Sequence, residues 1–350
     1  MRAVVYAGDG QVRVDDVPEP KIKGSRDAIV KVTRAAICGS DLHILTGKTP
    51  GMPEGGVIGH EFVGEVTEVA DGVSSDLAGA RVVGSFLISC GECEFCSKRR
   101  FNFCAKRRAL GFGPLTGDLA GSQAEYVRVP IAEVNLRRLS DEHDALDDEQ
   151  ALFAGDILTT GFYGAALSEI EPGDVIAVVG AGPVGLFCAG AAKTYSPKQV
   201  LLLDTDKKRV DFATDVMGLD AIDVSEVEPR EALMEAAGSL ADVAIEAVGA
   251  APALETAMNC VRDGGRITVI GVYGVDSYEM PMGICWVRGL DLRFAGMANV
   301  QRHWDQTLAA ISNGDIDPTK IITHRLSLDD AVEGYELFRS REALKVVLTP

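Results

Sequence analysis

Four cysteines in one short stretch are the residues of this sequence best suited to chemistry. Cys90, Cys93, Cys96 and Cys104 stand in the run CGECEFCSKRRFNFC. This spacing lets one loop bring four thiolates to a single Zn²⁺ ion, which binds sulfur in a tetrahedron at about 2.3 Å. A disulfide cluster is the alternative, but the opening residues MRAVVYAGDG lack the basic and then apolar pattern of an export signal. We therefore expect a structural zinc site in this loop.

A second group of candidate metal ligands precedes the cysteine run. The segment AAICGSDLHILTG carries Cys38, and GGVIGHEFVGEV carries His60. Thiolate and imidazole are both common zinc ligands. From the residues alone the pair has two interpretations: a second zinc site, or a small buried cysteine and an ordinary hydrogen-bonded histidine.

A dinucleotide-binding fingerprint lies in the middle of the chain. The apolar run VIAVV is followed by Gly180, Ala181, Gly182, Pro183, Val184 and Gly185, and then by a helix-like apolar segment. In such a strand–turn–helix unit the first glycine permits the tight turn and the second lets backbone amides approach a pyrophosphate. The third lets the helix pack on the strand, with the helix N-terminus facing the anion. The sequence therefore predicts a dinucleotide site.

An acidic residue indicates which dinucleotide is preferred. A second apolar run, residues 200–203, ends at Asp204, 19 residues after Gly185. A carboxylate at this point accepts hydrogen bonds from the adenosine ribose and repels a 2′-phosphate, so we expect NAD rather than NADP. Lys207, Lys208 and Arg209 follow, and they either begin an exposed helix or tolerate a phosphate.

The strand patterns predict two kinds of architecture. Around the fingerprint, six apolar strand candidates alternate with helix-like segments, which is typical of an α/β protein with a doubly wound parallel sheet. The N-terminal part instead has short alternating strands separated by glycine and proline, which predicts a small β-rich domain, such as a partly open barrel. The candidates in the six-stranded part are 175–179, 200–203, the segment near Asp220, 241–249, 264–272 and 290–296, and those in the N-terminal part are 28–37, 63–70 and 80–85.

Bulk composition limits the partners. With 350 residues, 47% of them hydrophobic, the chain is long enough for two domains. Apolar runs are all shorter than the ~18 residues of a membrane span. The 52 acidic and 34 basic residues give a net charge of −18, which argues against nucleic acid or an anionic membrane as a partner. We expect a cytoplasmic protein.

These segments together resemble one family. ICGSDLH, GHEFVGEV, the four-cysteine loop, VVGAGPVGL with Asp204, and the closing KVVLTP are similar to the zinc-dependent alcohol dehydrogenases of the medium-chain dehydrogenase/reductase superfamily. The similar segments follow in the same order along nearly the whole chain. The resemblance implies a GroES-like β-rich catalytic domain of residues 1–157 and 297–350, and a Rossmann domain of residues 158–296.

The resemblance also implies a catalytic zinc. Cys38 and His60 match two of its ligands, and Glu61 matches the adjacent carboxylate that lies behind the metal and can exchange onto it as a ligand. Asp41 matches the carboxylate that orients the ligand histidine. Many relatives have a cysteine as third ligand, whereas AGDILTTGFYGA places Asp156 there, as in some secondary-alcohol and formaldehyde-oxidising members. The alternative for Asp156 is an N-cap of the following helix.

The implied reaction is oxidation of an alcohol by hydride transfer to the nicotinamide. Ser40 and His43 match the family's proton relay, and Thr160 matches the threonine beside the nicotinamide ring. Phe86 matches a wall of the substrate pocket and favours short or unbranched alcohols. We expect Trp304 and Trp286 to belong to the core, as we do Met297, with a place in the pocket wall as the alternative.

Further positions match cofactor contacts of the family. Val248, Gly271 and Val272 follow two of the predicted strands and match residues that touch the nicotinamide half. Lys345, in ALKVVLTP, takes the place of a basic residue that holds the pyrophosphate. With Arg209 and the fingerprint residues, these complete the predicted NAD site.

The resemblance leaves assembly and substrate open. The stretch between Cys104 and Asp156 is short for the family, which implies a homo-oligomer, a tetramer or a dimer, in which residues 269–273 could pair across an interface. The substrate is expected to be a small alcohol or its aldehyde or ketone. A polyol, sugar or formaldehyde dehydrogenase, a metal-free quinone or enoyl reductase, and a non-catalytic NAD-binding sensor are the alternatives.

Overall fold

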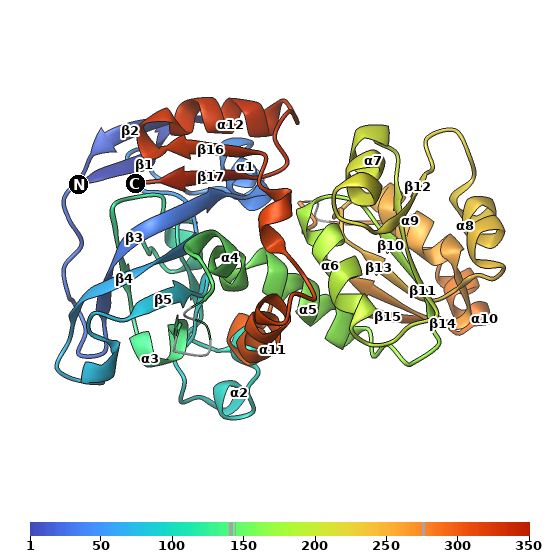
Figure 1. Ribbon diagram of the computed structural model, residues 1–350, viewed down its shortest axis with the longest axis horizontal. Helices are drawn as coiled ribbons and strands as arrows, with labels where there is room; N and C mark the ends of the chain where they lie inside the picture. Colours follow the sequence, from blue (N-terminus) through green and yellow to red (C-terminus); the bar gives the residue numbers. More distant parts are fainter. Residues whose placement is uncertain (140–142, 144, 275–276) are drawn as a thin grey trace. The chain divides into compact units, whose positions relative to one another are not determined.

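The computed structural model describes residues 1–139, 143, 145–274 and 277–350. These residues form two compact units (Figure 1). The first comprises residues 1–159 and 299–350, and the second comprises residues 160–298. The chain leaves the first unit within helix α5 (Ile157–Leu167) and returns just before helix α11 (Val300–Ser312). The unit boundaries in the structure follow residues 159 and 298, and those expected from the sequence follow residues 157 and 296, two residues earlier in each case.

The first unit is built on a mainly antiparallel sheet in the order β16-β17-β3-β4-β5-β9, with β8 also paired to β3. The segments predicted as strands in the N-terminal part are β3, β4 and β5, which confirms the β-rich architecture. Two short sheets, β1-β2 and β6-β7, complete the unit. The strands are β1 (Arg2–Gly8), β2 (Gln11–Asp16), β3 (Ala28–Ile37), β4 (Glu61–Val69), β5 (Arg81–Gly84), β6 (Leu87–Ile88), β7 (Arg108–Ala109), β8 (Tyr126–Val129), β9 (Leu136–Arg138), β16 (His324–Ser327) and β17 (Val346–Thr349).

Close packing across this sheet depends on a glycine. Phe62 is fully buried, and a Cβ atom on Gly84 of the neighbouring strand would lie 2.0 Å from Cζ of its ring. Any larger residue at position 84 would therefore displace the ring from the core. The helices of this unit are α1 (Gly39–Leu45), α2 (Glu94–Ser97), α3 (Ala132–Asn135), α4 (Asp148–Leu152), the start of α5, α11 and α12 (Ala331–Arg339), with the 3₁₀ turn η5 (Phe153–Gly155) between α4 and α5.

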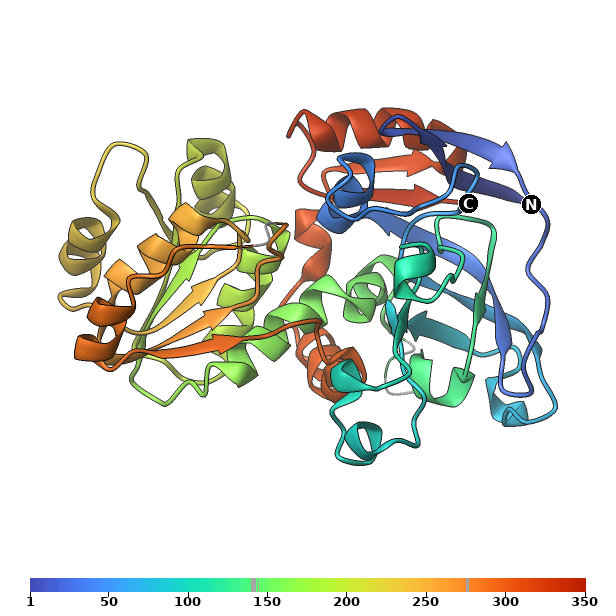
Figure 2. The same cartoon turned by 180° about the vertical axis from the view of Figure 1, so that it is seen from behind.

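The second unit is a parallel sheet of six strands in the order β12-β11-β10-β13-β14-β15. Helices lie on both of its faces, α6 on one and α9 on the other (Figures 1 and 2). The predicted doubly wound α/β sheet is thereby confirmed. The elements are β10 (Val175–Val179), α6 (Pro183–Lys193), β11 (Gln199–Asp204), α7 (Lys207–Asp215), β12 (Asp220–Asp223), α8 (Pro229–Ala237), β13 (Ala241–Glu246), α9 (Ala251–Cys260), β14 (Val261–Val269), α10 (Met282–Arg288) and β15 (Asp291–Phe294).

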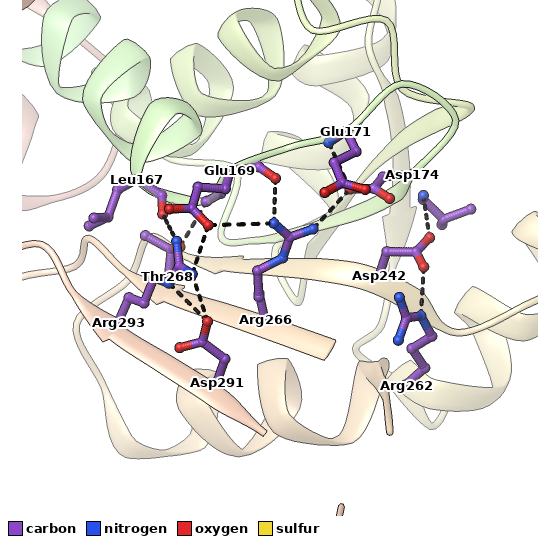
Figure 3. Close-up of polar contacts among 12 residues, drawn as sticks. Leu167, Glu169, Glu171, Asp174, Asp242, Arg262, Arg266, Thr268, Asp291 and Arg293 are labelled. Atoms are coloured by element: carbon purple, nitrogen blue, oxygen red, sulfur yellow. Dashed lines mark hydrogen bonds and ion pairs between the residues drawn. The ribbon is translucent and has the colours of Figure 1, made fainter. Parts of the chain in front are cut away.

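Two arginines fasten the segment that leads from α5 into β10 (Figure 3). Arg266 of β14 donates to the backbone carbonyl of Glu169 and lies 3.4 Å from the Asp174 carboxylate. Arg293 of β15 donates to the Leu167 carbonyl at 2.9 Å and pairs with the Glu169 carboxylate at 2.9 Å. The guanidinium fork suits this task because it binds several acceptors at once.

The two tryptophans differ in environment. Trp304 is 4% exposed, as expected for a core residue, whereas Trp286 is 83% exposed, so its assignment to the core is wrong. Trp286 lies on the outward face of α10, whose inward residue Cys285 packs against the core of the second unit. Met297 is 42% exposed and does not belong to the core either. Within the described ranges, no helix has the length and apolar character needed to cross a bilayer.

Candidate active site

Three predicted ligands meet in the first unit. Cys38 immediately precedes α1, His60 immediately precedes β4, and Asp156 lies between η5 and α5. One ligand atom from each lies within 4.8 Å of the others. His60 Nε2 is 3.1 Å and Cys38 Sγ is 4.0 Å from Asp156 Oδ2. The Asp156 carboxylate thus faces the two other ligands, as a metal ligand does.

The donor set of this cluster fits a zinc ion. One thiolate, one neutral imidazole and one carboxylate carry a charge of −2, which balances Zn²⁺, and three protein ligands leave a coordination position open for substrate. His60 and Asp156 are buried, and Cys38 is partly buried. An uncompensated carboxylate in such a place would be costly, which is a further reason to expect a cation there.

Asp41 organises two of these ligands. It is fully buried, and its Oδ1 lies 3.1 Å from His60 Nδ1, which leaves Nε2 free for a metal. Its Oδ2 accepts a hydrogen bond from the backbone amide of Cys38 at 2.9 Å. Burial opposes the charged form of His60, but Asp41 and Asp156 outweigh it and hold the pKa of His60 well above its usual value. The two carboxylates therefore favour a positive charge at this position, whether a proton or a metal ion.

Glu61 and Lys345 form a buried ion pair beside this cluster. The Lys345 ammonium contacts the Glu61 carboxylate, and both side chains are almost completely buried. The ammonium also lies 5.6 Å from the centre of the Phe153 ring. Burial raises the pKa of Glu61 to about 7, against the opposing effect of Lys345.

This pair corrects the expected role of Lys345. We expected the lysine to hold a pyrophosphate, but in the structure its side chain is 1% exposed and its ammonium pairs with the Glu61 carboxylate. The physical reason is the cost of burial: a charged carboxylate inside the unit needs a cation, and Lys345 is the one that reaches it.

The two relay candidates lie on α1. Ser40 Oγ is 3.1 Å from His60 Nε2, so this hydroxyl stands at the nitrogen that faces the metal position. His43 follows one turn later and is partly buried. Burial and the nearby Lys48 lower the pKa of His43, so its imidazole is neutral and able to accept a proton at neutral pH.

Two aromatic rings flank the cluster. Phe86 lies edge-on to the His60 ring at a centroid distance of 6.1 Å, and Phe112 lies tilted to it at 5.0 Å. Phe86 was expected from the sequence. Phe112 was missed, because it belongs to an irregular loop after β7 where neither periodicity nor a motif marks it. The metal position thus has two apolar aromatic neighbours.

The four-cysteine loop forms a separate cluster in the same unit. Cys90 and Cys96 sulfurs lie 3.9 Å apart, those of Cys93 and Cys96 lie 3.5 Å apart, and the Cys90 amide donates to Cys104 Sγ at 3.3 Å. Four ligands at about 2.3 Å from one ion are separated by about 3.8 Å, so these spacings fit a zinc tetrathiolate. All eight cysteines are free, which speaks against the disulfide alternative.

Helix α11 holds both the four-cysteine loop and the loop that leads to Asp156. Asn299, at its N-cap, accepts from the Phe101 amide at 3.2 Å and donates to the Arg99 carbonyl at 2.9 Å, both in the cysteine loop. Trp304 donates its indole N–H to the carbonyl of Ala154 at 3.0 Å, two residues before Asp156. One rigid element therefore supports two loops that are remote in sequence.

The fingerprint residues occupy the turn between β10 and α6. Gly180 has φ of +104°, a conformation that side chains disfavour. A Cβ atom on Gly185 would lie 1.8 Å from the Gly180 carbonyl oxygen, so only glycine permits this approach of helix and turn. Gly182 is the N-cap of α6, followed by Pro183 and Val184 as its first residues. The helix N-terminus thus begins at the turn, as anion binding requires.

Asp204 closes the same turn from β11. Its Oδ2 accepts a hydrogen bond from the Ala181 amide at 2.7 Å, and its Oδ1 accepts from the Asp206 amide at 2.8 Å. Arg209 reaches back toward the turn: a Cβ atom on Gly182 would lie 3.8 Å from its Nη1. An acidic and a basic side chain therefore both border the place expected for the cofactor.

The remaining predicted cofactor residues are also in the second unit. Val248 and Val272 are 52% and 62% exposed and follow the carboxyl ends of β13 and β14. The loops carrying them touch, since a Cβ atom on Gly271 would lie 2.1 Å from the Gly249 amide nitrogen. Thr160 lies in α5, as the first residue of this unit. A β-rich unit with a cysteine–histidine–aspartate cluster, followed in the same chain by a dinucleotide fold, defines a metal-dependent dehydrogenase.

Comparison with known proteins agrees with this class. Residues 24–137 match the family model of the alcohol dehydrogenase GroES-like domain, and residues 183–313 match that of the zinc-binding dehydrogenase. An uncharacterised zinc-type alcohol dehydrogenase-like protein of Bacillus subtilis is 36% identical, with the whole of both chains covered. This chain belongs to the zinc-type alcohol dehydrogenases of the medium-chain dehydrogenase/reductase superfamily.

Two further relatives are informative. The alcohol dehydrogenase of Thermus sp. ATN1 has a similar structure with a TM-score of 0.94 and 40% identity, covering 100% of this chain and 99% of its own. The glutathione-independent formaldehyde dehydrogenase of Pseudomonas aeruginosa is 32% identical and is covered over 97% of its length by the whole of this chain. The protein is thus an oxidoreductase of the alcohol dehydrogenase type.

Proposed function

We propose that the protein oxidises small alcohols to aldehydes or ketones, and catalyses the reverse reaction, with zinc held by Cys38, His60 and Asp156. The convergence of a sulfur, a nitrogen and an oxygen ligand atom within 4.8 Å carries this proposal. When bound there, zinc supplies Lewis acidity that lowers the pKa of an alcohol hydroxyl. The first unit is the catalytic domain, and the second binds the dinucleotide that accepts the hydride.

The surrounding residues have separate tasks in this proposal. Asp41 fixes the ring and tautomer of His60 through the 3.1 Å contact at Nδ1. Ser40, placed at the metal-facing nitrogen, receives the proton of the alcohol, and His43 accepts it further along α1. Phe86 and Phe112 orient the apolar part of the substrate and keep water away from the reacting atoms.

A second zinc and NAD complete the proposal. The sulfur spacings of the four-cysteine cluster support a structural zinc there. The Asp204 carboxylate at the end of β11 supports NAD, since it would repel a 2′-phosphate. Arg209 beside the turn favours some tolerance of NADP. Among similar structures, a zinc-binding dehydrogenase of Sinorhizobium meliloti, 28% identical, is bound to NADP, and an Escherichia coli enzyme, 27% identical, is complexed with NADH.

Formaldehyde oxidation is a second candidate. The likeness to the formaldehyde dehydrogenase of Pseudomonas aeruginosa suggests it, and two aromatic rings beside the metal cluster favour a very small substrate. The same rings argue against a polyol or sugar, whose hydroxyls need polar partners.

We also propose that the protein is a homo-oligomer. Strand β15 ends the sheet, so among the described strands it has a neighbour on one side only. Beside it stand exposed apolar side chains: Phe294 is 67%, Trp286 83% and Ile284 60% exposed. We had expected residues 269–273 at an interface. Val269 lies in β14 between two strands and offers no free edge, while residues 270–273 follow the end of that strand. A drop in molar mass on Trp286→Glu in light scattering, but not on Val332→Glu, would support β15 and α10 as the contact.

The decisive experiment on function follows NAD⁺ and NADP⁺ reduction with primary, secondary, aromatic and polyhydroxy alcohols and with formaldehyde. Each rate is repeated after removal of metal by a chelator and after return of zinc. We expect turnover that is lost with the metal and restored by zinc. Turnover indifferent to chelation would favour the metal-free reductase, and cofactor binding without turnover on any substrate would favour the sensor.

A further inference from the structure

A buried chain of polar groups stands behind Asp41. The Tyr335 hydroxyl donates to Gln123 Oε1 at 2.9 Å. The Gln123 amide in turn donates to Asp41 Oδ2 at 3.1 Å and to the backbone carbonyl of Ala36 at 3.0 Å. Exposure is 1% for Tyr335 and 0% for Gln123 and Asp41, so water cannot replace these contacts.

The orientation of the Gln123 amide follows from its partners. Both groups on one side of it, the Asp41 carboxylate and the Ala36 carbonyl, can only accept, so the NH₂ group must face them. The Tyr335 hydroxyl then fills the remaining place as donor to Oε1. Removing that hydroxyl leaves a buried amide oxygen without a donor and lets the amide turn.

Gln123 also packs against the backbone that carries His60. Its backbone N–H donates to the Ile58 carbonyl at 3.1 Å. Gly59 has φ of +90°, and a Cβ atom there would lie 2.3 Å from Cγ of Gln123. The glutamine stem therefore fills the space beside the turn just before His60, while its amide reaches Asp41.

Asp41 is the point where these contacts meet the metal ligands. Oδ2 receives two N–H groups, those of the Cys38 backbone and of Gln123, and Oδ1 is left facing His60 Nδ1. Loss of the Gln123 donor would free the carboxylate to rotate. Both the ring of His60 and the backbone of Cys38 would then lose their common support.

We propose that Gln123 and Tyr335 are positioning residues for the metal cluster: they act through Asp41 to hold His60 and Cys38 in the arrangement that binds zinc tightly. The inference rests on the proposed zinc site. It adds helix α12 to the elements that determine metal affinity, because α12 carries Tyr335, about 275 positions after His60.

The test measures zinc affinity in the full-length protein by competition with a chromophoric chelator, for wild type, Tyr335→Phe and Gln123→Met. We expect the site of Cys38, His60 and Asp156 to lose about 10–100-fold in zinc affinity in Gln123→Met, the range found for outer-sphere partners of zinc ligands. Tyr335→Phe, which removes one hydroxyl, should cost this site about 3–10-fold. The four-cysteine site should keep its zinc, and it serves as an internal reference for folding. With cobalt at Cys38, His60 and Asp156, the visible absorption bands should shift in both variants.

Tyr6→Phe is the matched control. Tyr6 packs against the same apolar cluster as Tyr335, and the substitution removes the same hydroxyl without touching Gln123. Zinc affinity should be unchanged. A double-mutant cycle adds a second check: because Tyr335 and Gln123 share a hydrogen bond and both interact with Asp41, the loss of affinity in the double variant should be smaller than the sum of the two single losses.

The outcomes separate this inference from the proposed function. Wild-type protein that binds zinc at both sites, with variants of unchanged affinity and unchanged cobalt spectrum, overturns the positioning role and leaves the function intact. Additive losses in the double variant would also contradict it. Wild-type protein that binds zinc only at the four cysteines overturns the proposed function itself.

Discussion

At the residue scale, the candidate metal cluster combines side chains that the chain separates widely. Cys38, His60 and Asp156 come from three loops, and the Asp41 carboxylate contacts both of the first two. Burying this carboxylate costs desolvation, and its contacts with the Cys38 amide and His60 Nδ1 offset part of that cost. Beside this cluster, the Lys345 ammonium balances the charge of the Glu61 carboxylate.

His43 provides a prediction of pH dependence. Its pKa lies below the usual 6.5 because of burial and Lys48. As the pH falls through that pKa, the imidazole becomes charged and can no longer accept a proton, so turnover should fall on the acidic side only below about pH 6.5. Lys48→Met should raise the pKa of His43 and move the fall to higher pH.

His43→Gln should slow turnover near neutral pH by about a hundredfold, with partial recovery on addition of imidazole. Steady-state rates between pH 5 and 9 check both variants. A pH profile of His43→Gln that coincides with wild type would dismiss the histidine as proton acceptor.

The buried pair Glu61–Lys345 predicts an effect on stability. Lys345→Met keeps the size of the side chain but leaves a buried carboxylate without its cation, which should lower the free energy of unfolding of the first unit by about 3–5 kcal/mol. The double variant Lys345→Met/Glu61→Gln should recover much of this loss. Urea unfolding in a Trp286→Phe background measures it, because Trp304, in the first unit, is then the only tryptophan. Equal stability of the single variant and wild type would contradict the pairing.

Residue type and spacing alone left Cys38 and His60 open between a zinc site and an ordinary buried pair. The family resemblance favoured the zinc site and added Asp156 as third ligand, and the structure brings the three side chains together. The partner of Lys345 could not be read from the sequence, because a contact over 284 positions leaves no local pattern. Phe112 and Gln123 lack such a pattern as well, since each lies in an irregular loop.

At the element scale, period-two and apolar patterns predicted the strands well. The strand expected at 28–37 is β3 (Ala28–Ile37), and that at 175–179 is β10 (Val175–Val179), because both are flanked by breakers and buried over most of their length. The exposure of helix α10 was not predicted. Its composition, MGICWVR, is that of a core helix, yet the structure leaves most of its apolar side chains exposed.

The contacts of Arg266 in β14 predict an effect of this residue on the stability of the second unit. Arg266→Met should lower its free energy of unfolding by about 1–2 kcal/mol, because a charged donor to a backbone carbonyl and to a largely buried carboxylate is lost. Arg266→Lys should restore only part of this, since an ammonium cannot bind both acceptors as a fork.

Arg262→Met is the matched control for Arg266, since Arg262 pairs with Asp242 at 2.6 Å but has a side chain that is 50% exposed. Its effect should stay within about 0.5–1 kcal/mol, as is usual for surface ion pairs. Differential scanning calorimetry distinguishes the two. A larger loss of stability in Arg262→Met than in Arg266→Met would contradict the fastening role of Arg266.

At the scale of the whole molecule, the chain divides its chemistry between two units. The first contains both cysteine-bearing clusters, and the second contains the fingerprint turn and Asp204. The order of motifs along the sequence already indicated this division, because a parallel sheet with a glycine turn and a β-rich part with metal ligands have different patterns. The choice of alcohol could not be predicted, since a pocket is formed by loops whose contacts are not encoded locally.

The most direct test of the central claim is the number of zinc ions per chain, measured together with alcohol oxidation, in wild type and in Asp156→Ala. We predict two zinc ions in wild type and one in Asp156→Ala, with turnover lost in the variant and the zinc of the four cysteines retained. An Asp156→Ala protein that keeps two zinc ions and full turnover, or an active wild type with zinc only at the four cysteines, would contradict the assignment of Cys38, His60 and Asp156 as the catalytic metal site.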